Sequence, residues 1–411
     1  MELAINKGEA TLLNLDLAGD RLNLNPRDPA FYQDPYPVYQ QLHERAPLFY
    51  WEQFERYCFV RQADVSAILR DRRFGRSLAP VYGTNAPRPF LEVDNFSLLD
   101  LEPPAHTRLR GLVQKAFMAR QIERLRPRIE ALSHELIDRM QAATQTDLLP
   151  AFATPIPVLV IAEMLGVPAE MSQQLLDWSH AMVGVYELAP SEAQKQAATR
   201  AADEFVAFLR GYVRQRRQQP RDDLITLLIE AEEDGDRLSE MELIATCILL
   251  LNAGHEATVN VIGNGVLALL QNPAQLARWR ADPALTPAAI EELLRYDTPL
   301  HLFNRWVLQD LAFGGLELQQ GMQVSLLLGA ANRDGTVFDR PDQLDLSRSP
   351  NPHVSLGGGI HYCLGAPLAR LELQTALPIL LERLPQLALV EPPRFKNSYH
   401  FRGLERLLVS Y

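Results

Sequence analysis

The chain has 411 residues, 47% of them apolar, which is enough to bury a large hydrophobic core. Its formal net charge of −11 produces an overall field that repels a phosphate backbone, so nucleic acid is not an expected partner. The three cysteines, Cys58, Cys247 and Cys363, form no C-x-x-C pair and are odd in number, which argues against a disulfide framework or a structural zinc site. A reducing cytoplasm fits this usage of cysteine.

Residues 1–411 are predicted to form a single domain, in which 1–24 make an N-terminal extension. No Gly/Ser-rich linker, long block of one charge or internal repeat divides the chain. The first residues lack the basic and apolar segments of a signal peptide. The most apolar internal stretch, 247–251, is far shorter than the roughly 18 residues that a membrane span needs. We therefore expect a soluble, cytoplasmic protein.

The spacing of apolar residues predicts a mainly α chain with small β-sheets in its first and last quarters. The predicted elements, in chain order, are a helix near 36–46, strands near 48–52 and 57–61, a long irregular loop over 78–97, helical periods over 122–140, 156–165, 170–186, 191–217, 223–232, 239–270 and 283–296, strand-like pieces near 305–327, a Gly-rich loop at 357–359 and a helix over 366–384.

The longest predicted helix begins after Ser239 and continues to about Leu270 without a proline. Ser239 and Glu242 have the spacing of a capping box, which marks the start of a helix. Roughly 32 residues at 1.5 Å each give a length of about 48 Å, so this helix would cross the whole protein. Gly254 lies in its middle, where glycine costs about 1 kcal/mol relative to alanine. We expect a functional reason to offset that cost.

The most informative motif is SLGGGIHYCLG, residues 355–365, which comes directly before a predicted helix. A cysteine thiolate needs backbone N–H donors and the positive end of a helix nearby to stay deprotonated. Cys363 precedes a helix that starts near Ala366, and the flanking glycines allow the backbone to approach a flat cofactor. The alternative interpretation is a small buried cysteine beside a turn.

This motif resembles the haem loop of the cytochrome P450 family, Phe-x-x-Gly-x-(His/Arg)-x-Cys-x-Gly. Gly359, His361, Cys363 and Gly365 match the pattern, and Leu356 replaces the usual phenylalanine beneath the porphyrin. The resemblance covers nearly the whole chain. It implies the cytochrome P450 fold, with haem b (iron protoporphyrin IX) between the long central helix and the cysteine loop. It also implies that Cys363 is the axial ligand of the haem iron.

A second motif is the pair Glu292 and Arg295, which share a helix face because they are three residues apart. Taken alone, such a pair is typical of a surface ion pair. In the resembled family, a Glu-x-x-Arg pair is a structural signature on the proximal side of the haem. Residues 341–348, which end at Arg348, match the loop that completes its network.

A third motif, AGHEAT, begins at Ala253 in the middle of the longest helix and resembles the family pattern Ala/Gly-Gly-x-Asp/Glu-Thr-Thr/Ser. The small side chains of Ala253 and Gly254 would let oxygen and substrate lie against the helix, and Glu256 would feed protons through water. Ala257 replaces the usual threonine, and Thr258 is displaced by about 100° around the helix axis. We therefore expect the substrate to bring its own hydroxyl or carbonyl group, as in a minority of family members that act on natural products.

The resemblance also implies residues that bind the haem propionates, because two buried carboxylates require positive charge nearby. These are His106 and Arg110, which lie four apart on a predicted helix, together with Arg305 and His361. Each of them taken alone fits a solvated or core role. The residues expected to line a substrate pocket, each of which would equally fit the core, are Tyr82, Phe90, Phe96, Met182, Val183, Tyr186, Leu249, Leu250, Ala253, Leu300, Leu302, Phe303 and Phe401.

The implied function is a haem-thiolate monooxygenase that inserts one oxygen atom from O2 into a C–H or C=C bond of an apolar small molecule, such as a secondary metabolite. The chain shows no Walker loop and no nucleotide-binding glycine motif, and it ends soon after the helix that follows the cysteine loop. Electrons are therefore expected from a separate ferredoxin or flavodoxin and its reductase, and the protein is expected to be a monomer.

Two other functions stay open. The missing threonine at Ala257 is compatible with a peroxygenase that uses H2O2 directly. A haem-binding sensor or carrier without oxidation chemistry is the third interpretation, and the presence of Gly254 and Glu256 argues against it.

Overall fold

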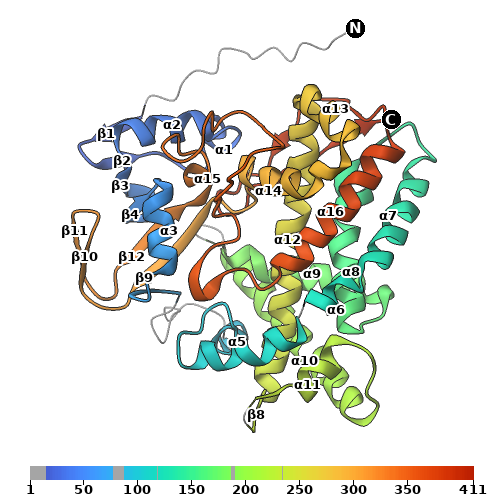
Figure 1. The fold of residues 1–411 in the computed structure, drawn as a ribbon. Helices are drawn as coiled ribbons and strands as arrows, with labels where there is room; N and C mark the ends of the chain where they lie inside the picture. Colours follow the sequence, from blue (N-terminus) through green and yellow to red (C-terminus); the bar gives the residue numbers. More distant parts are fainter. Residues whose placement is uncertain (1–14, 77–87, 118, 187–189, 234) are drawn as a thin grey trace.

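The computed structural model describes residues 15–76, 88–117, 119–186, 190–233 and 235–411. Helices dominate these residues, and the strands form small sheets (Figure 1), which confirms the predicted mainly α class. The α-helices are α1 (Pro29–Tyr32), α2 (Tyr36–Arg45), α3 (Gln62–Arg70), α4 (Arg88–Asn95), α5 (Ala105–Ala116), α6 (Ala119–Glu123), α7 (Arg126–Met140), α8 (Pro155–Leu165), α9 (Ser172–Val183), α10 (Glu192–Gln218), α11 (Leu224–Glu230), α12 (Glu240–Gln271), α13 (Pro273–Ala281), α14 (Thr286–Tyr296), α15 (Leu328–Ala331) and α16 (Ala366–Arg383).

The largest sheet has seven strands in the order β1-β2-β3-β4-β12-β9-β5. Its first two strands lie inside the predicted N-terminal extension. They pair with each other antiparallel, and the second of them joins β3 by parallel pairing. A three-stranded sheet, β13-β16-β6, brings the end of the chain beside the end of α7, where the Tyr411 hydroxyl donates to the Met140 carbonyl (Figure 1). The strands are β1 (Asp16–Ala18), β2 (Arg21–Asn23), β3 (Leu48–Trp51), β4 (Arg56–Phe59), β5 (Phe74–Gly75), β6 (Gln145–Asp147), β7 (Glu232–Glu233), β8 (Asp236–Arg237), β9 (Leu302–Val307), β10 (Leu311–Phe313), β11 (Leu316–Leu318), β12 (Gln323–Leu327), β13 (Ala388–Leu389), β14 (Arg394–Phe395), β15 (Leu404–Arg406) and β16 (Leu408–Ser410).

Helix α12 is the central element and passes through the middle of the molecule (Figure 1). Its start confirms the predicted capping box, because the Ser239 hydroxyl accepts the Glu242 amide and the Ser239 amide donates to the Glu242 carboxylate at 2.8 Å. It packs against α8, α9, α14 and α16 in the largest part of the core. In the ranges that the structure describes, no helix combines the length and apolar character needed to cross a membrane.

The prediction of one irregular loop over 78–97 is wrong in its second half, where α4 forms. Pro89 stands in the first turn of α4, where its missing N–H breaks no helical hydrogen bond. Val93 is buried against the large core, so tertiary packing supports this short helix. Residues 78–87 of the predicted loop lie outside the described residues.

Candidate active site

Cys363 lies between a short 3-10 turn, Gly359–His361, and the first residue of α16. The loop is closed by its own backbone, since the Cys363 amide donates to the Leu356 carbonyl at 3.0 Å. Gly359 has a φ of +65°, and a Cβ there would stand 2.4 Å from the Leu69 carbonyl oxygen of α3. Glycine is therefore required at this position by contact with α3, a reason that the sequence alone did not provide.

The sulfur of Cys363 has a different environment from the other two thiols. Burial raises the pKa of the Cys363 thiol, but the amides of Gly365 and Ala366 and the guanidiniums of Arg110 and Arg370 act in the opposite direction. Cys58 and Cys247 are fully buried, and burial raises the pKa of each thiol to about 12. Among the three cysteines, Cys363 is thus the one placed at a helix N-terminus between cations, as a thiolate ligand requires.

Three of the four predicted propionate residues meet at this loop, to which His361 itself belongs. His106 of α5 lies against His361, with ring centroids 4.5 Å apart. Arg110, one turn further along α5, donates to the Tyr362 carbonyl at 2.9 Å. His361 in turn lies 3.3 Å from a carboxylate oxygen of Glu102, which the sequence analysis did not assign to the site.

Arg305, the fourth predicted residue, projects from β9 and is only 1% exposed. Burial and the neighbouring charge of Arg76 lower its pKa to about 9, against a smaller opposing effect of Glu102. Burial likewise lowers the pKa of His106 to about 4. In the described residues, Nη2 of Arg305 and both ring nitrogens of His106 have no hydrogen-bond partner.

Such a set of buried, unpaired nitrogen atoms matches what two carboxylates would satisfy, because buried polar groups are nearly always hydrogen-bonded. The residues present therefore fit haem, with its thiolate ligand and its two propionates. Sequence reasoning missed Arg76. Its guanidinium carbon lies 4.5 Å from the centroid of the Phe303 ring, and its positive charge lowers the pKa of Arg305.

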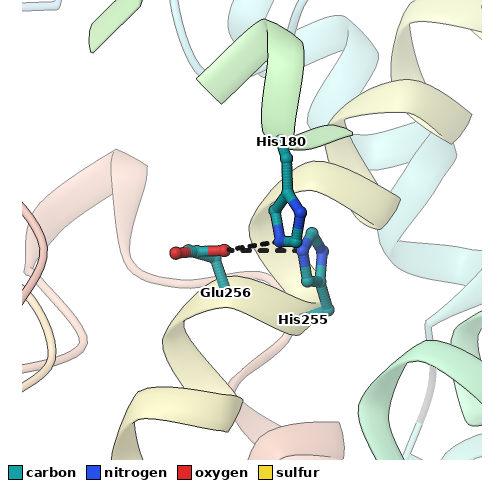
Figure 2. A group of neighbouring side chains, drawn as sticks. All are labelled: His180, His255 and Glu256. Atoms are coloured by element: carbon teal, nitrogen blue, oxygen red, sulfur yellow. Dashed lines mark ion pairs between the residues drawn. The ribbon is translucent and has the colours of Figure 1, made fainter. Parts of the chain in front are cut away.

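The middle of α12 presents small residues and one carboxylate. Ala253 is exposed although it lies halfway along the most central helix, and Gly254 and Ala257 are partly exposed. Thr258 is buried, and its hydroxyl donates to the Gly254 carbonyl at 3.1 Å. That bond holds the hydroxyl within the helix, so Thr258 is poorly placed to replace the threonine missing at Ala257. Glu256 points away from the helix toward α9, where His180 lies 3.6 Å from its carboxylate (Figure 2).

The Glu292–Arg295 pair is wholly buried, so the interpretation as a surface ion pair is wrong. Both side chains are 0% exposed, and the guanidinium makes two bonds of 2.8 Å to the carboxylate. Arg348 adds a further bond to Glu292 at 3.1 Å. The network reaches the cysteine loop through Asn332, which bonds both the Ser355 hydroxyl and the Val354 amide.

The residues predicted to line a substrate pocket differ widely in solvent exposure. Met182, Leu250 and Leu302 are buried, the last of them in the core beneath the N-terminal strands. Phe96 is 38% exposed. Leu300 and Phe401 pair with each other through a β-bridge. Val183, Leu249 and Phe303 are partly buried, whereas Tyr82 and the side chains of Phe90 and Tyr186 lie outside the described residues.

Comparisons with known proteins agree with this fold. The family model described as Cytochrome P450 matches residues 33–386. Cytochrome P450 107B1 of Saccharopolyspora erythraea is 42% identical over 396 residues, which cover 93% of this chain and 96% of that protein. Mycinamicin IV hydroxylase/epoxidase of Micromonospora griseorubida is 41% identical over 357 residues, or 85% of this chain and 88% of that protein.

Among solved structures, P450BioI in complex with an acyl carrier protein ligated to hexadec-9Z-enoic acid is similar, with a TM-score of 0.89 and 37% identity. That match covers 93% of this chain and 99% of P450BioI. The chain therefore belongs to the cytochrome P450 family, whose cofactor is haem, and it is an enzyme of the P450 monooxygenase class.

Proposed function

We propose that this enzyme inserts one oxygen atom from O2 into a C–H or C=C bond of an apolar small molecule of secondary metabolism. The observation that carries the proposal is the set of unpaired, buried nitrogens of His106 and Arg305 beside the Cys363 loop. Haem, when bound, supplies the activation of O2 that this oxidation requires, and a thiolate ligand favours O–O cleavage. The amides of Gly365 and Ala366 would favour the anionic form of the Cys363 sulfur, against the burial that raises the pKa of this thiol.

Two arginines and two histidines would together hold the cofactor's carboxylates. Arg305 and His106 offer free nitrogen atoms, and Arg110 adds a charge that is already oriented by the Tyr362 carbonyl. His361 is oriented by Glu102, so its ring is fixed before a propionate arrives. Leu356, Gly359 and Gly365 would complete the cysteine side of the pocket, and Ala253 would face it from α12.

Carbon monoxide tests this arrangement directly. The reduced wild-type protein with bound carbon monoxide should show the strongly red-shifted optical band of a thiolate-ligated haem. Cys363→Ser should lose that band, and Arg305→Met should lose haem more readily to an apoprotein acceptor. Absence of the band in wild type, or its survival in Cys363→Ser, contradicts the proposal.

On the α12 side, the Glu256 carboxylate would move protons through water toward the segment at Ala253. Since Ala257 has no hydroxyl and the Thr258 hydroxyl is held by the helix, the substrate is proposed to supply a hydroxyl or carbonyl of its own. Ala257→Thr should raise the yield of product per reductant consumed for substrates without such a group, and change it little for substrates that have one. If Ala257→Thr changes the yield of product per reductant by the same factor for every substrate, this idea is wrong.

The substrate is proposed to be of medium or large size, and of the polyketide or acyl-chain type. Support comes from the names of relatives, which include Mycinamicin IV hydroxylase/epoxidase and Polyketide biosynthesis cytochrome P450 PksS of Bacillus subtilis, and from the solved complex of P450BioI with an acyl carrier protein. Val183, Leu249 and Phe303 are the partly buried apolar side chains proposed to contact it. A ligand screen that follows displacement of the water ligand by the optical spectrum would identify binders.

Electrons are proposed to come from a separate ferredoxin or flavodoxin, in the cytoplasm, where the three free cysteines would stay reduced. Ala257 also supports a second candidate function, direct use of H2O2. The two are separated by comparing product formation with H2O2 alone and with reductant, ferredoxin and ferredoxin reductase. Faster turnover with H2O2 would favour the peroxygenase.

A further inference from the structure

A cluster of two imidazoles and one carboxylate links α9 to α12. His180 of α9 and His255 of α12 both turn their rings toward the carboxylate of Glu256 (Figure 2). The same oxygen, Oε2 of Glu256, lies 3.6 Å from Nε2 of His180 and 3.5 Å from Nε2 of His255. The three side chains bring one nitrogen or oxygen atom each within 4.8 Å of one another.

The burial and the orientation of the His255 ring are not explained by an ion pair with Glu256. His255 is 1% exposed, and its Nδ1 lies 2.9 Å from the Leu251 carbonyl one turn earlier on α12. A carbonyl only accepts, so Nδ1 carries the proton, and the neutral ring then presents a lone pair at Nε2. That buried Nε2 has no hydrogen-bond partner among the described residues. It faces a carboxylate, which also offers only lone pairs.

This orientation is the one that metal-ligating histidines adopt, because their second ring nitrogen usually donates to a backbone carbonyl or a carboxylate. The spacing agrees as well. In a tetrahedral zinc site, bonds of about 2.0–2.1 Å place neighbouring ligand atoms about 3.4 Å apart. The two separations from Glu256 Oε2 are 3.5 and 3.6 Å, and the side chain of His180 is 57% exposed, so it is free to complete the geometry.

One neighbouring charge opposes a cation at this place. The ammonium of Lys396 lies 3.9 Å from Oε1, the other oxygen of the Glu256 carboxylate. Its side chain is 46% exposed, so it can turn into solvent at small cost when a metal ion arrives. Both imidazoles approach Oε2, which leaves Oε1 to Lys396 and lets the two interactions coexist.

We propose that His180, His255 and Glu256 bind one transition-metal ion of the zinc type. Two imidazoles and a carboxylate suit Zn²⁺, and three protein ligands leave a fourth position for water. Binding would join α9 to α12. If Glu256 carries protons as proposed above, the metal would also withdraw its carboxylate from that task, so this second consequence depends on the proposed function and the binding itself does not.

Calorimetric titration of the haem-loaded protein with ZnCl2, in a buffer that does not bind metal, tests the site. Wild type should bind one equivalent. His180→Ala removes an exposed ligand without disturbing the core, and it should weaken binding at least about tenfold, since even outer-shell partners of metal ligands are worth 10–100-fold in affinity. His134→Ala is the matched control, because His134 is an exposed histidine on α7 that contacts Arg383 instead.

X-ray absorption at the zinc edge, which the haem iron does not obscure, should show two imidazole ligands in wild type and one in His180→Ala. The site is overturned if His180→Ala binds zinc as tightly as wild type, or if His134→Ala weakens binding equally. In turnover assays, zinc should inhibit wild type more strongly than His180→Ala, and a chelator should reverse the inhibition. Binding without inhibition would leave the metal site in place and overturn only the role of Glu256 as proton carrier.

Discussion

The two sides of the predicted haem pocket hold their charged groups in opposite ways. On the cysteine side, Glu292 is 0% exposed and its two oxygens accept from Arg295, Arg348 and the Asp345 amide. On the α12 side, Glu256 is 15% exposed, and the side-chain nitrogen atoms of His180, His255 and Lys396 stand 3.5 to 3.9 Å from its carboxylate. Among the residues that the structure describes, the first carboxylate is fully hydrogen-bonded, whereas the second has neighbours only at these longer distances.

This difference distinguishes charged groups that hold the fold together from charged groups that can take part in binding or reaction. A buried charge with every lone pair bonded fixes the geometry around it, and removing one partner leaves an uncompensated charge. Groups whose bonding capacity is unmet, such as His255 and His106, are the groups able to bind something else. The buried Glu292 network should therefore respond to mutation in stability, whereas mutation of the groups with unmet bonding capacity, on either side of the pocket, should change turnover or ligand binding.

The largest expected effect is on stability, from Arg295→Leu. It leaves the buried Glu292 carboxylate without its bidentate partner, which should lower the free energy of unfolding by about 3–5 kcal/mol. Denaturant unfolding followed by circular dichroism measures this change. Arg21→Leu, which breaks an exposed pair with Glu52, is the control and should change the stability little. A small effect of Arg295→Leu would remove the contrast between the two sides.

The second largest effect is expected in Glu256→Gln, and it concerns turnover. Loss of a group that carries protons should lower the turnover number by about a hundredfold, or nearly 3 kcal/mol, with little change in stability. The assay should contain a chelator so that metal binding does not contribute. In that buffer His134→Ala, at an exposed position on α7, should react as wild type does. Unchanged turnover in Glu256→Gln would show that the carboxylate is not on the proton path.

A smaller effect is expected from pH on the cysteine side, at Glu291. Burial alone would raise the pKa of this carboxyl, but hydrogen bonds from Arg370 and His353 outweigh burial and lower the pKa to about 2 from the usual 4.5. A depressed carboxyl pKa adds stability above pH 4.5 that is lost as the pH falls toward 2. The loss should be about 1–3 kcal/mol, because the side chain is 28% exposed and partly screened.

Comparison with Glu291→Gln isolates this contribution. The variant should be less stable than wild type at pH 6 and should lose less stability on acidification. Unfolding curves at several pH values between 6 and 3 would show the difference narrowing. Parallel curves at all pH values would mean that the Arg370 pair is not formed in solution.

Much of this organisation was predictable because it is encoded locally. The capping box at Ser239, the i,i+3 spacing of Glu292 and Arg295, and the position of Cys363 just before a helix can all be recognised within a few neighbouring residues. The α12 boundaries and the helix after the cysteine loop are confirmed within one or two residues. Local hydrogen bonding decides such features, so the sequence is sufficient to predict them.

The features that were missed depend on packing between distant segments. Helix α4 is supported by burial of Val93, which no capping signal announces. The reason for Gly359 is the approach of the Leu69 carbonyl from α3. His180 meets Glu256 only because α9 packs on α12, and it belongs to no motif. The sequence shows which residues are unusual, whereas tertiary packing decides which of them meet.

The smallest effect concerns Gly254, whose helical cost the sequence analysis assigned to function. A Cβ at this position would meet only Ile161 of α8, at 3.7 Å, which is ordinary van der Waals contact. Because alanine fits there and favours helix, Gly254→Ala should raise the free energy of unfolding by about 0.5–1 kcal/mol. If the glycine is kept for the proposed chemistry, the same variant should lower turnover while the protein becomes more stable. Higher stability with full activity would mean that a glycine at this position of α12 is not needed for the reaction. Lower stability would mean that α12 packs too tightly against Ile161 of α8 to accept a methyl group.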